Sequence, residues 1–277
     1  MIKIVESPNY VVRANGWVQD ASSFPNLRRF VSAFVPDCEY FKTITANISE
    51  KVEERDGRSR LLDILKTRPI AIGYKDIVGT TFRPRSASRC NGIGQAALPG
   101  QSRWFQIDWP TDNFLRWAVV LQFVSFDMTK DEYSATDAGR SFALAETDED
   151  AIKIYEKQLS FYPPAKRILE LLEEGPKTKF GLGQKLGFIG EEGFTSVSDA
   201  AFLERYRYSY GDERRKLAEN FEGSSDKYAR QICSWLALSG FVSSTRIPFD
   251  AGDGTEISLG VYSITPKGKN LDRKSVV

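Results

Sequence analysis

Apolar side chains recur at helical spacing through most of the 277 residues. Pro25 opens the first predicted helix, whose apolar face holds Leu27, Phe30 and Phe34. The same spacing predicts further helices over residues 47–66, 74–78, 88–98, 113–122, 146–161, 165–174, 179–186, 197–206 and 225–239. Thr111-Asp112 is expected to cap the helix over 113–122. Residues 53–60 are polar enough to form a loop that divides the helix over 47–66 in two. Residues 1–24 are mixed and polar, and we expect an extended N-terminal arm there.

Two pairs of segments repeat within the chain. The pairs are residues 116–124, RWAVVLQFV, with residues 234–242, SWLALSGFV, and residues 133–139, YSATDAG, with residues 262–268, YSITPKG. Each copy is typical of a helix, a strand, a loop, a strand, a threonine cap and a further helix. That order is the second half of a winged helix-turn-helix, and the short helices over 74–78 and 179–186 would supply the first half.

The predicted fold is therefore α+β, mainly α with small β hairpins, in two tandem winged-helix-turn-helix subdomains. An acidic run at residues 146–150 and the pair Pro163-Pro164 mark the boundary, which gives subdomains over residues 1–155 and 156–277. The second hairpin is expected to carry a longer Gly/Asp-rich loop over residues 246–256. Simple core packing explains the repeat equally well, because Trp and Phe are core residues first, and winged helices also mediate protein contacts.

Composition excludes several classes of protein. The chain has no histidine, which removes histidine-based triads and most zinc sites. Its three cysteines are widely spaced without a CxxC motif, which fits a reducing cytoplasm. No apolar stretch is long enough to predict a signal peptide or a membrane span. The 38 Lys and Arg residues against 37 Asp and Glu give a net charge of +1, which neither favours nor excludes a nucleic-acid partner.

Catalytic motifs are scarce. The sequence has no phosphate loop, no GxSxG and no HExxH. The candidates for a metal-dependent nuclease are Glu50-Lys51, Asp131 and Glu213, and none falls on a convincing strand. Two-metal hydrolysis needs carboxylates that converge at one edge of a sheet. We therefore expect no catalytic residue, no metal site and no cofactor in this chain.

The predicted helix over residues 225–239 has an outward face suited to reading bases. Its inward residues are Tyr228, Ile232, Trp235 and Leu236, and its outward residues are Lys227, Arg230, Gln231 and Ser234. Lys and Arg suit guanine, Gln suits adenine, and Glu222 just ahead of the helix can accept from cytosine. Ser224 and Ser225 can cap the helix and offer N–H groups to a phosphate. An ordinary solvated helix face is the simpler explanation of the same residues.

A second candidate is the arginine-rich segment over residues 80–109. Its polar side chains alternate with small residues that let the backbone approach a surface closely: Arg85, Arg89, Gln95, Gln101 and Arg103. Asp108 is the only acid nearby in sequence, so the guanidinium groups are expected to meet phosphate or base edges.

Along nearly its whole length, the chain resembles the recognition region of FokI-like type IIS restriction endonucleases. The matching stretches are residues 16–19 with 26–27 and 29, 74–75 with 78–80, 114–118, 162–165 with 167–169, 193–196 and 222–230. The last of them, EGSSDKYAR, is highly specific. The resemblance covers the first two recognition subdomains, both winged-helix-like, and stops before the third subdomain and the cleavage domain.

The resemblance implies binding of double-stranded DNA at a short asymmetric site, with cleavage by a nuclease domain or subunit in cis or in trans. Magnesium is expected only for that cleavage domain. The DNA-facing positions that the resemblance implies are Gln19, Arg85, Gln101, Trp109, Glu222 and Lys227. Asp20 and Glu219 stand where the family has asparagine, which replaces a donor by a pure acceptor and puts the inherited base preference in doubt.

Two other functions stay open on the sequence. A nuclease centre within residues 40–66 would make cleavage metal-dependent and sensitive to substitution of Glu50 or Glu53. A stand-alone transcriptional regulator would normally dimerise and read a palindrome, whereas two unlike winged helices in one chain favour an asymmetric site.

Overall fold

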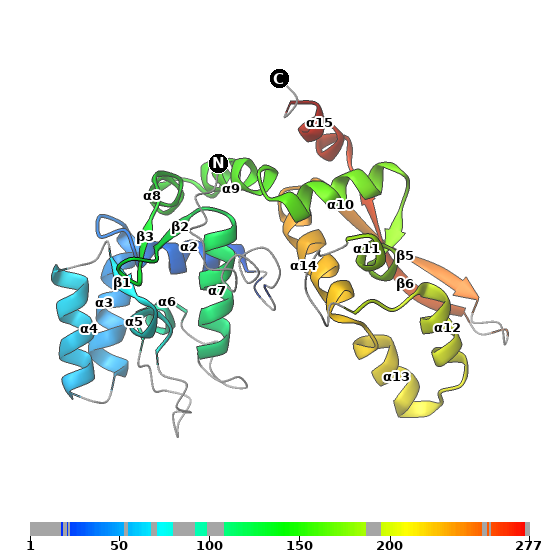
Figure 1. Cartoon of the computed structure of the whole chain (residues 1–277), viewed down its shortest axis with the longest axis horizontal. Coiled ribbons are helices and arrows are strands. Elements are labelled where there is room, and N and C mark those ends of the chain that lie inside the picture. Colours follow the sequence, from blue (N-terminus) through cyan, green and yellow to red (C-terminus); the bar gives the residue numbers. More distant parts are fainter. Residues whose placement is uncertain are drawn as a thin grey trace. The chain divides into compact units, whose positions relative to one another are not determined.

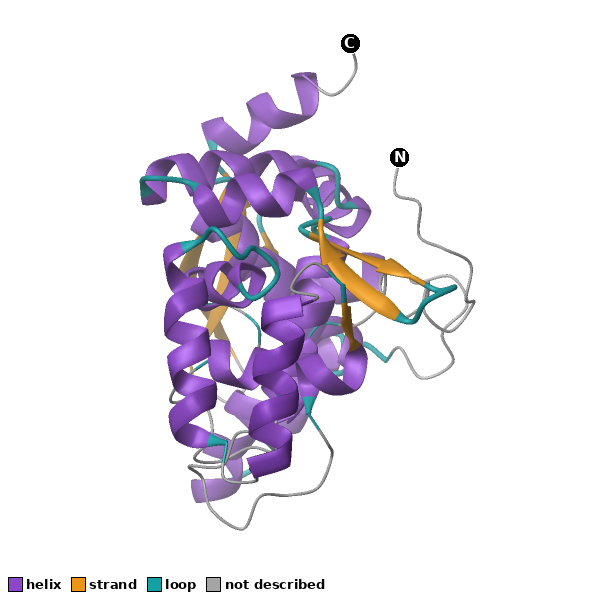
Figure 2. Ribbon diagram, turned by 90° about the vertical axis from the view of Figure 1, so that its left-hand side faces the viewer, coloured by secondary structure: helices purple, strands orange, loops and turns teal. Residues whose placement is uncertain are grey.

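The computed structural model describes residues 18, 21, 23–52, 55–67, 71–79, 92–98, 108–186, 195–250, 254 and 256–274. They fall into two compact units, which we call unit 1 (Met1–Gln158) and unit 2 (Leu159–Val277). Both units are mainly helical, and strands make up a small part of each (Figure 1, Figure 2). Among the described residues, no helix is both long and apolar enough to cross a membrane.

Unit 1 combines helices with one small antiparallel sheet (Figure 1). Its elements are α2 (Phe24–Ser32), α3 (Glu39–Lys51), α4 (Arg55–Thr67), β1 (Ile72–Gly73), α5 (Tyr74–Val78), α6 (Ile93–Ala97), α7 (Asp108–Val120), β2 (Val124–Asp127), β3 (Glu132–Ala135), α8 (Asp137–Leu144) and α9 (Asp148–Ser160). The sheet has the order β1-β3-β2, with Tyr133 of β3 opposite Ile72 of β1 and Phe126 of β2.

The predicted division of the helix over residues 47–66 is confirmed, since α3 ends at Lys51 and α4 begins at Arg55, but the break is shorter than the predicted loop over 53–60. The Arg58 guanidinium donates two hydrogen bonds to the Val52 carbonyl, at 2.8 and 2.6 Å. Helix α7 begins at Asp108, so Thr111 and Asp112 lie inside it and do not cap it. Thr111 is only 1% exposed, so it packs in the interior as part of the helix. Tertiary packing therefore extends α7 past this local capping signal.

Aromatic rings fill the core of unit 1. Trp117 of α7 is fully buried, and its ring lies edge-on to Tyr155 of α9 with centroids 6.1 Å apart. Phe142 of α8 stacks on Phe123 at 4.3 Å and meets the edge of Phe24 at 5.5 Å. Four helices or helix ends far apart in the sequence therefore share one core.

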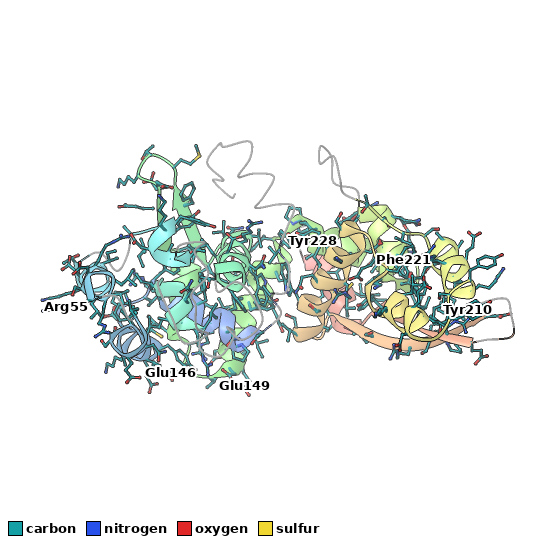
Figure 3. All side chains as sticks on the ribbon, turned by 90° about the horizontal axis from the view of Figure 1, so that it is seen from below. Arg55, Glu146, Glu149, Tyr210, Phe221 and Tyr228 are labelled. Atoms are coloured by element: carbon teal, nitrogen blue, oxygen red, sulfur yellow. The ribbon has the colours of Figure 1, made fainter. Side chains whose placement is uncertain are left out.

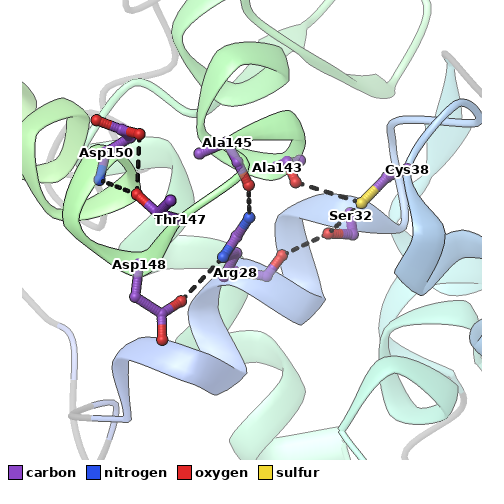
Figure 4. Close-up of polar contacts among 8 residues, drawn as sticks. All are labelled: Arg28, Ser32, Cys38, Ala143, Ala145, Thr147, Asp148 and Asp150. Carbon is purple, nitrogen blue, oxygen red and sulfur yellow. Dashed lines mark hydrogen bonds and ion pairs between the residues drawn. The ribbon is translucent and has the colours of Figure 1, made fainter.

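A polar contact at the surface of this core ties α2 to the turn between α8 and α9 (Figure 4). Arg28 is largely buried and donates to the Asp148 carboxylate at 3.0 Å and to the Ala145 carbonyl. In the same region the Cys38 thiol donates to the Ala143 carbonyl at 3.3 Å. These bonds satisfy backbone oxygens at the end of α8.

Unit 2 repeats the arrangement of helices around a three-stranded sheet (Figure 1). Its elements are α10 (Pro163–Glu173), β4 (Lys177–Thr178), α11 (Lys179–Leu186), α12 (Asp199–Arg207), α13 (Gly211–Asn220), α14 (Ser224–Leu238), β5 (Val242–Asp250), β6 (Glu256–Ile264) and α15 (Pro266–Lys274). The strand order β4-β6-β5 matches that of unit 1. The loop expected over 246–256 is shorter than predicted, because Arg246 pairs with Gly260 and Asp250 with Glu256.

The internal repeat is present in the hydrogen bonds that close each hairpin. Thr136 N donates to the Phe123 carbonyl at 3.0 Å, and Thr265 N donates to the Phe241 carbonyl at 3.0 Å. Each phenylalanine N–H in turn bonds back to the preceding helix, at 2.8 Å in unit 1 and 2.9 Å in unit 2. The repeated sequence therefore encodes one backbone design used twice.

A glycine completes each copy of this closure. Thr136 Oγ1 accepts from Gly139 N at 3.0 Å, and Thr265 Oγ1 accepts from Gly268 N at 3.1 Å, which caps α8 and α15. A Cβ atom at Gly139 would lie 1.9 Å from the Phe123 carbonyl oxygen, and one at Gly268 would lie 2.3 Å from the Phe241 oxygen. Only glycine fits this approach of helix to hairpin.

Both units are winged-helix-like, and they differ in where extra helices enter. Helices α2 and α10 each have a proline in the first turn, and each packs on the long helix of its unit, α7 or α14. Unit 1 inserts α3 and α4 between α2 and β1, whereas unit 2 inserts α12 and α13 between α11 and α14. The predicted fold, mainly α with small β hairpins in two winged-helix subdomains, is confirmed.

Candidate nucleic-acid interface

Helix α14 is anchored in unit 2 by its buried face. Four side chains are at most 2% exposed, as the sequence predicted: Tyr228, Ile232, Trp235 and Leu236. Gln231 departs from the prediction, because it is 8% exposed and belongs with the interior. Lys227 is partly exposed and Arg230 is exposed, so these two residues keep their predicted outward positions.

The start of α14 is built around a buried carboxylate. Gly223 is the N-cap residue, and Asp226 Oδ2 accepts from its N–H at 2.8 Å. Asp226 also accepts from Val197 N at 2.8 Å and from Ser196 Oγ at 2.6 Å. Burial raises the pKa of Asp226 above its ordinary value, while these hydrogen bonds and the charge of Lys179 act in the opposite direction. The carboxylate thereby joins the segment before α12 to the first turn of α14.

The first N–H groups of α14 already have partners. Ser224 N donates to Thr195 Oγ1 at 3.3 Å, and Ser225 N donates to the Thr195 carbonyl at 2.9 Å. The Ser225 hydroxyl donates to the Gly183 carbonyl at 2.6 Å, and the residue is 3% exposed. The expectation that Ser224 and Ser225 cap α14 and offer these N–H groups to a phosphate is therefore wrong, because Gly223 caps the helix and Thr195 takes both donors.

Glu222 lies between two cations, just before the N-terminus of α14. Its side chain is 4% exposed, although it carries a charge. Arg230 donates to Oε1 at 3.0 Å, and the Lys179 ammonium bonds Oε2. Lys179 is the first residue of α11, and its ammonium also lies 5.0 Å from the centroid of the Phe180 ring. Both carboxylate oxygens are thus engaged by charge-assisted hydrogen bonds.

The backbone on either side of Glu222 is fixed as well. Phe221 packs on an apolar cluster that includes Phe180 and Phe202, and its N–H donates to the Leu217 carbonyl at 3.0 Å. Figure 3 shows Phe221 beside the helices of unit 2, with Tyr228 on α14. A Cβ atom at Gly223 would lie 2.2 Å from the Thr195 carbonyl oxygen, so this position admits no side chain.

Within the arginine-rich segment, residues 92–98 are described with their side chains, and all of them are buried. Gln95 is 7% exposed, and its Nε2 donates to the Val78 carbonyl at 2.8 Å. Helix α6, which carries Gln95, packs so closely that a Cβ atom at Gly94 would lie 2.6 Å from Thr111 and 2.7 Å from Phe30. The prediction of Gln95 as a DNA-facing residue is therefore wrong, because its side-chain amide is buried and bonds the Val78 carbonyl.

The remaining predicted positions lie outside the residues or side chains that the structure describes. These are Gln19, Asp20, Arg85, Arg89, Gln101 and Arg103, together with the side chains of Trp109 in α7 and Glu219 in α13. The repeat still relates one of them to unit 2. Trp109 lies eight residues before Trp117, as Lys227 lies eight residues before Trp235, so the two occupy equivalent positions.

The nuclease candidates belong to different elements. Glu50 lies on α3, Asp131 in the turn between β2 and β3 with φ of 54°, and Glu213 on α13, where it pairs with Arg205 at 3.4 Å. Within the described ranges, no group of three or more Asp, Glu, Cys or His residues could hold a metal ion.

Two winged-helix units, each with a long helix that precedes its hairpin, make this chain a tandem winged-helix protein. Its two halves match the two parts of one recognition domain. Residues 13–145 match subdomain 1 of the FokI recognition domain, and residues 151–272 match subdomain 2. The chain belongs to the FokI recognition-domain family.

Full-length relatives give the same result. The chain is 34% identical to the type II restriction enzyme FokI of Planomicrobium okeanokoites over 275 residues, which cover 95% of the chain and 47% of the enzyme. It is 32% identical to the type II restriction enzyme StsI of Streptococcus sanguinis, with 92% and 44% covered. The chain thus spans about half the length of these relatives.

Solved structures of FokI share the fold. The structure of FokI bound to DNA matches with a TM-score of 0.86 and 33% identity, over 94% of this chain and 47% of that one. A second FokI structure matches with a TM-score of 0.84 and 34% identity, over 93% and 46%.

Proposed function

We propose that this chain binds double-stranded DNA at a short asymmetric site, as the recognition part of a type IIS restriction endonuclease. Cleavage would be carried out by a nuclease domain or subunit in cis or in trans, and magnesium is needed only there. The observation that carries the proposal is the close match of both units to FokI bound to DNA, combined with Glu222 and Lys227 at the start of α14.

In unit 2, Lys227 and Glu222 suit direct base reading. A lysine ammonium donates to guanine O6 and N7, and a glutamate carboxylate accepts from cytosine N4. Both residues lie where the first turn of a winged-helix recognition helix enters the major groove. Arg230 is one turn farther along the outward face of α14 and suits a phosphate.

In unit 1, Trp109 takes the place that Lys227 has in unit 2, which supports a DNA-facing position for it. We assign the same role to the neighbouring polar residues on the arm and the arginine-rich segment: Gln19, Asp20, Arg85, Arg89, Gln101 and Arg103. Asp20 and Glu219 replace asparagines of the family, so the bases read by this chain are expected to differ from those of its relatives at one or more positions.

Two unlike recognition units in one chain favour an asymmetric target, because each presents different side chains to its half of the site. A dimeric regulator would give a palindrome instead. A nuclease centre within residues 40–66 would give cut DNA that depends on Glu50. The wide cysteine spacing supports a cytoplasmic location for this activity.

Selection of random duplex DNA on the purified chain, with magnesium present, tests the proposal. One enriched, non-palindromic and uncut site is the expected result. An enriched palindrome would support the regulator, and cleavage lost in Glu50→Gln would support the nuclease centre. Absence of any enriched sequence would contradict sequence-specific binding altogether.

A further inference from the structure

The contacts of Glu222 indicate how its carboxylate is held for reading a base. This inference rests on the proposed function. Both Glu222 oxygens are already bonded, to Arg230 and to Lys179, and the side chain is 4% exposed. Each oxygen could accept a second hydrogen bond, but at 4% exposure the two cations cover the carboxylate, so a base amine reaches it only where one of them gives way. The two cations differ in a way that decides which one leaves.

Lys179 is the less exposed partner. Its side chain is 18% exposed, and it lies over the Phe180 ring. Its charge also acts on the buried Asp226 carboxylate, so it serves two acids at once. Moving this ammonium away would remove its charge from two buried carboxylates, which costs a large amount of free energy.

Arg230 is the exposed partner. Its side chain is 50% exposed, and it reaches Glu222 from the next turns of α14. A guanidinium at such a position exchanges readily between a carboxylate and a DNA phosphate, since both suit its planar donor set. A phosphate near α14 would therefore draw Arg230 away and open Oε1.

We propose that Lys179 is a positioning residue that fixes Glu222 through Oε2, and that Arg230 covers Oε1 until a DNA phosphate takes it. The carboxylate then presents one free oxygen, in a fixed orientation, to the amine of a cytosine. Lys179 acts through Glu222 and touches no base. Arg230 contributes to affinity through phosphate and leaves base preference unchanged.

The test compares variants of the full chain on the DNA site selected by the wild type. Lys179→Met is expected to lower preference about tenfold at a single base pair, the one that Glu222→Gln also relaxes. Lys179→Arg keeps a cation and is expected to restore most of that preference. The double variant of Lys179→Met with Glu222→Gln should show no further loss, because one residue acts through the other.

Arg230→Gln is expected to keep the preference at that base pair and to lower the slope of log affinity against log salt by about 0.9. Matched controls are Lys185→Met, also on α11 and paired with Glu174, and Arg167→Gln, which pairs with Glu170. Neither control should change preference or slope. Thermal unfolding of each variant shows whether it is folded. If Lys179→Met is unfolded, the base preference of Lys179→Arg is compared with that of the wild type instead.

Several results would overturn the assignment. One is full preference in Lys179→Met with the fold intact. Another is loss of preference in Arg230→Gln as large as that in Lys179→Met. If Glu222→Gln leaves every base preference unchanged, Glu222 reads no base and DNA binding stands without this mechanism. If the wild type enriches no site, the proposed function falls, and this mechanism with it.

Discussion

Units 1 and 2 share a closure and differ at the start of their long helices. In both, the hairpin is tied to the next helix by a threonine cap and a glycine packed on a phenylalanine carbonyl. At the equivalent position ahead of the core tryptophan, unit 1 has Trp109 and unit 2 has Lys227. The repeat therefore preserves the residues that close the fold, while the position that we propose to face DNA differs between the two units.

The two units also differ in where their inserted helices lie relative to the long helix. In unit 1, α3 and α4 enter before the sheet begins, far along the chain from α7. In unit 2, the inserted α12 and α13 lead directly into α14, and the segment before α12 bonds its first turn through Ser196 and Val197. The first turn of α14 is therefore held by hydrogen bonds from the segment that leads into the inserted helices.

The largest expected effect breaks the shared closure. Gly139→Ala and Gly268→Ala should each lower the free energy of unfolding by about 3 kcal/mol, because the added Cβ meets a backbone oxygen that cannot move aside. Alanine normally favours a helix over glycine, so this result has the opposite sign to helix propensity. Urea unfolding measures it.

Gly181→Ala on α11 is the control, since the nearest atom to its Cβ would be 3.7 Å away. It should be neutral or stabilise by up to about 1 kcal/mol. Wild-type stability in both closure variants would show that the shared closure is not what holds the two hairpins.

The next effect sharpens the difference between the long helices. Lys227→Ala should lose about 1–3 kcal/mol of binding free energy and relax preference at one base pair. Trp109→Ala should weaken binding without changing the salt dependence, because it removes no charge. Titration of the selected duplex at several salt concentrations separates the two. Lys269→Ala, an exposed lysine on α15, is the control; an equal loss there would mean that binding is unspecific.

A smaller effect concerns the arginine-rich segment of unit 1. Arg85→Ala should weaken binding in one of two ways that the measurement distinguishes. If Arg85 contacts a base, preference relaxes at a position different from that of Lys227; if it contacts phosphate, the salt slope falls by about 0.9. Unchanged affinity, preference and slope would remove Arg85 from the interface.

The smallest effect is a pH dependence confined to unit 2. Because burial raises the pKa of Asp226, the folded chain binds this proton more tightly than the unfolded chain does. The contribution of Asp226 to stability is therefore greatest below its ordinary pKa and declines as pH rises through the raised one. The stability of wild type relative to Asp226→Asn should fall over that interval. If the stability of wild type relative to Asp226→Asn rose with pH instead, the pKa of Asp226 would be lowered by folding and not raised.

Sequence patterns predicted the larger features of the fold well. The helices with strong apolar faces, the two hairpins and the repeat all appear, since each depends on local periodicity. The two-residue strands β1 and β4 were missed, because two residues carry no period. The start of α7 was misplaced by its capping signal, and the burial of Thr111 explains why.

Predictions of the site were less complete for a physical reason. Glu222 and Lys227 could be proposed from the sequence because they lie beside a helix start with an evident outward face. Lys179 precedes Glu222 by 43 residues, and only tertiary packing brings them together. Gln95, Ser225 and Gln231 looked suited to DNA by residue type, but each is buried, and residue type alone does not report burial.

The most direct test of the account is the ratio of the chain's affinities for the selected duplex and for a scrambled duplex of the same composition. At about 0.15 M salt we expect a ratio of about a thousand or more, with no cleavage of either duplex by the chain alone. A ratio near one, at any salt concentration, would contradict sequence-specific recognition and leave only the fold in common with the FokI recognition domain.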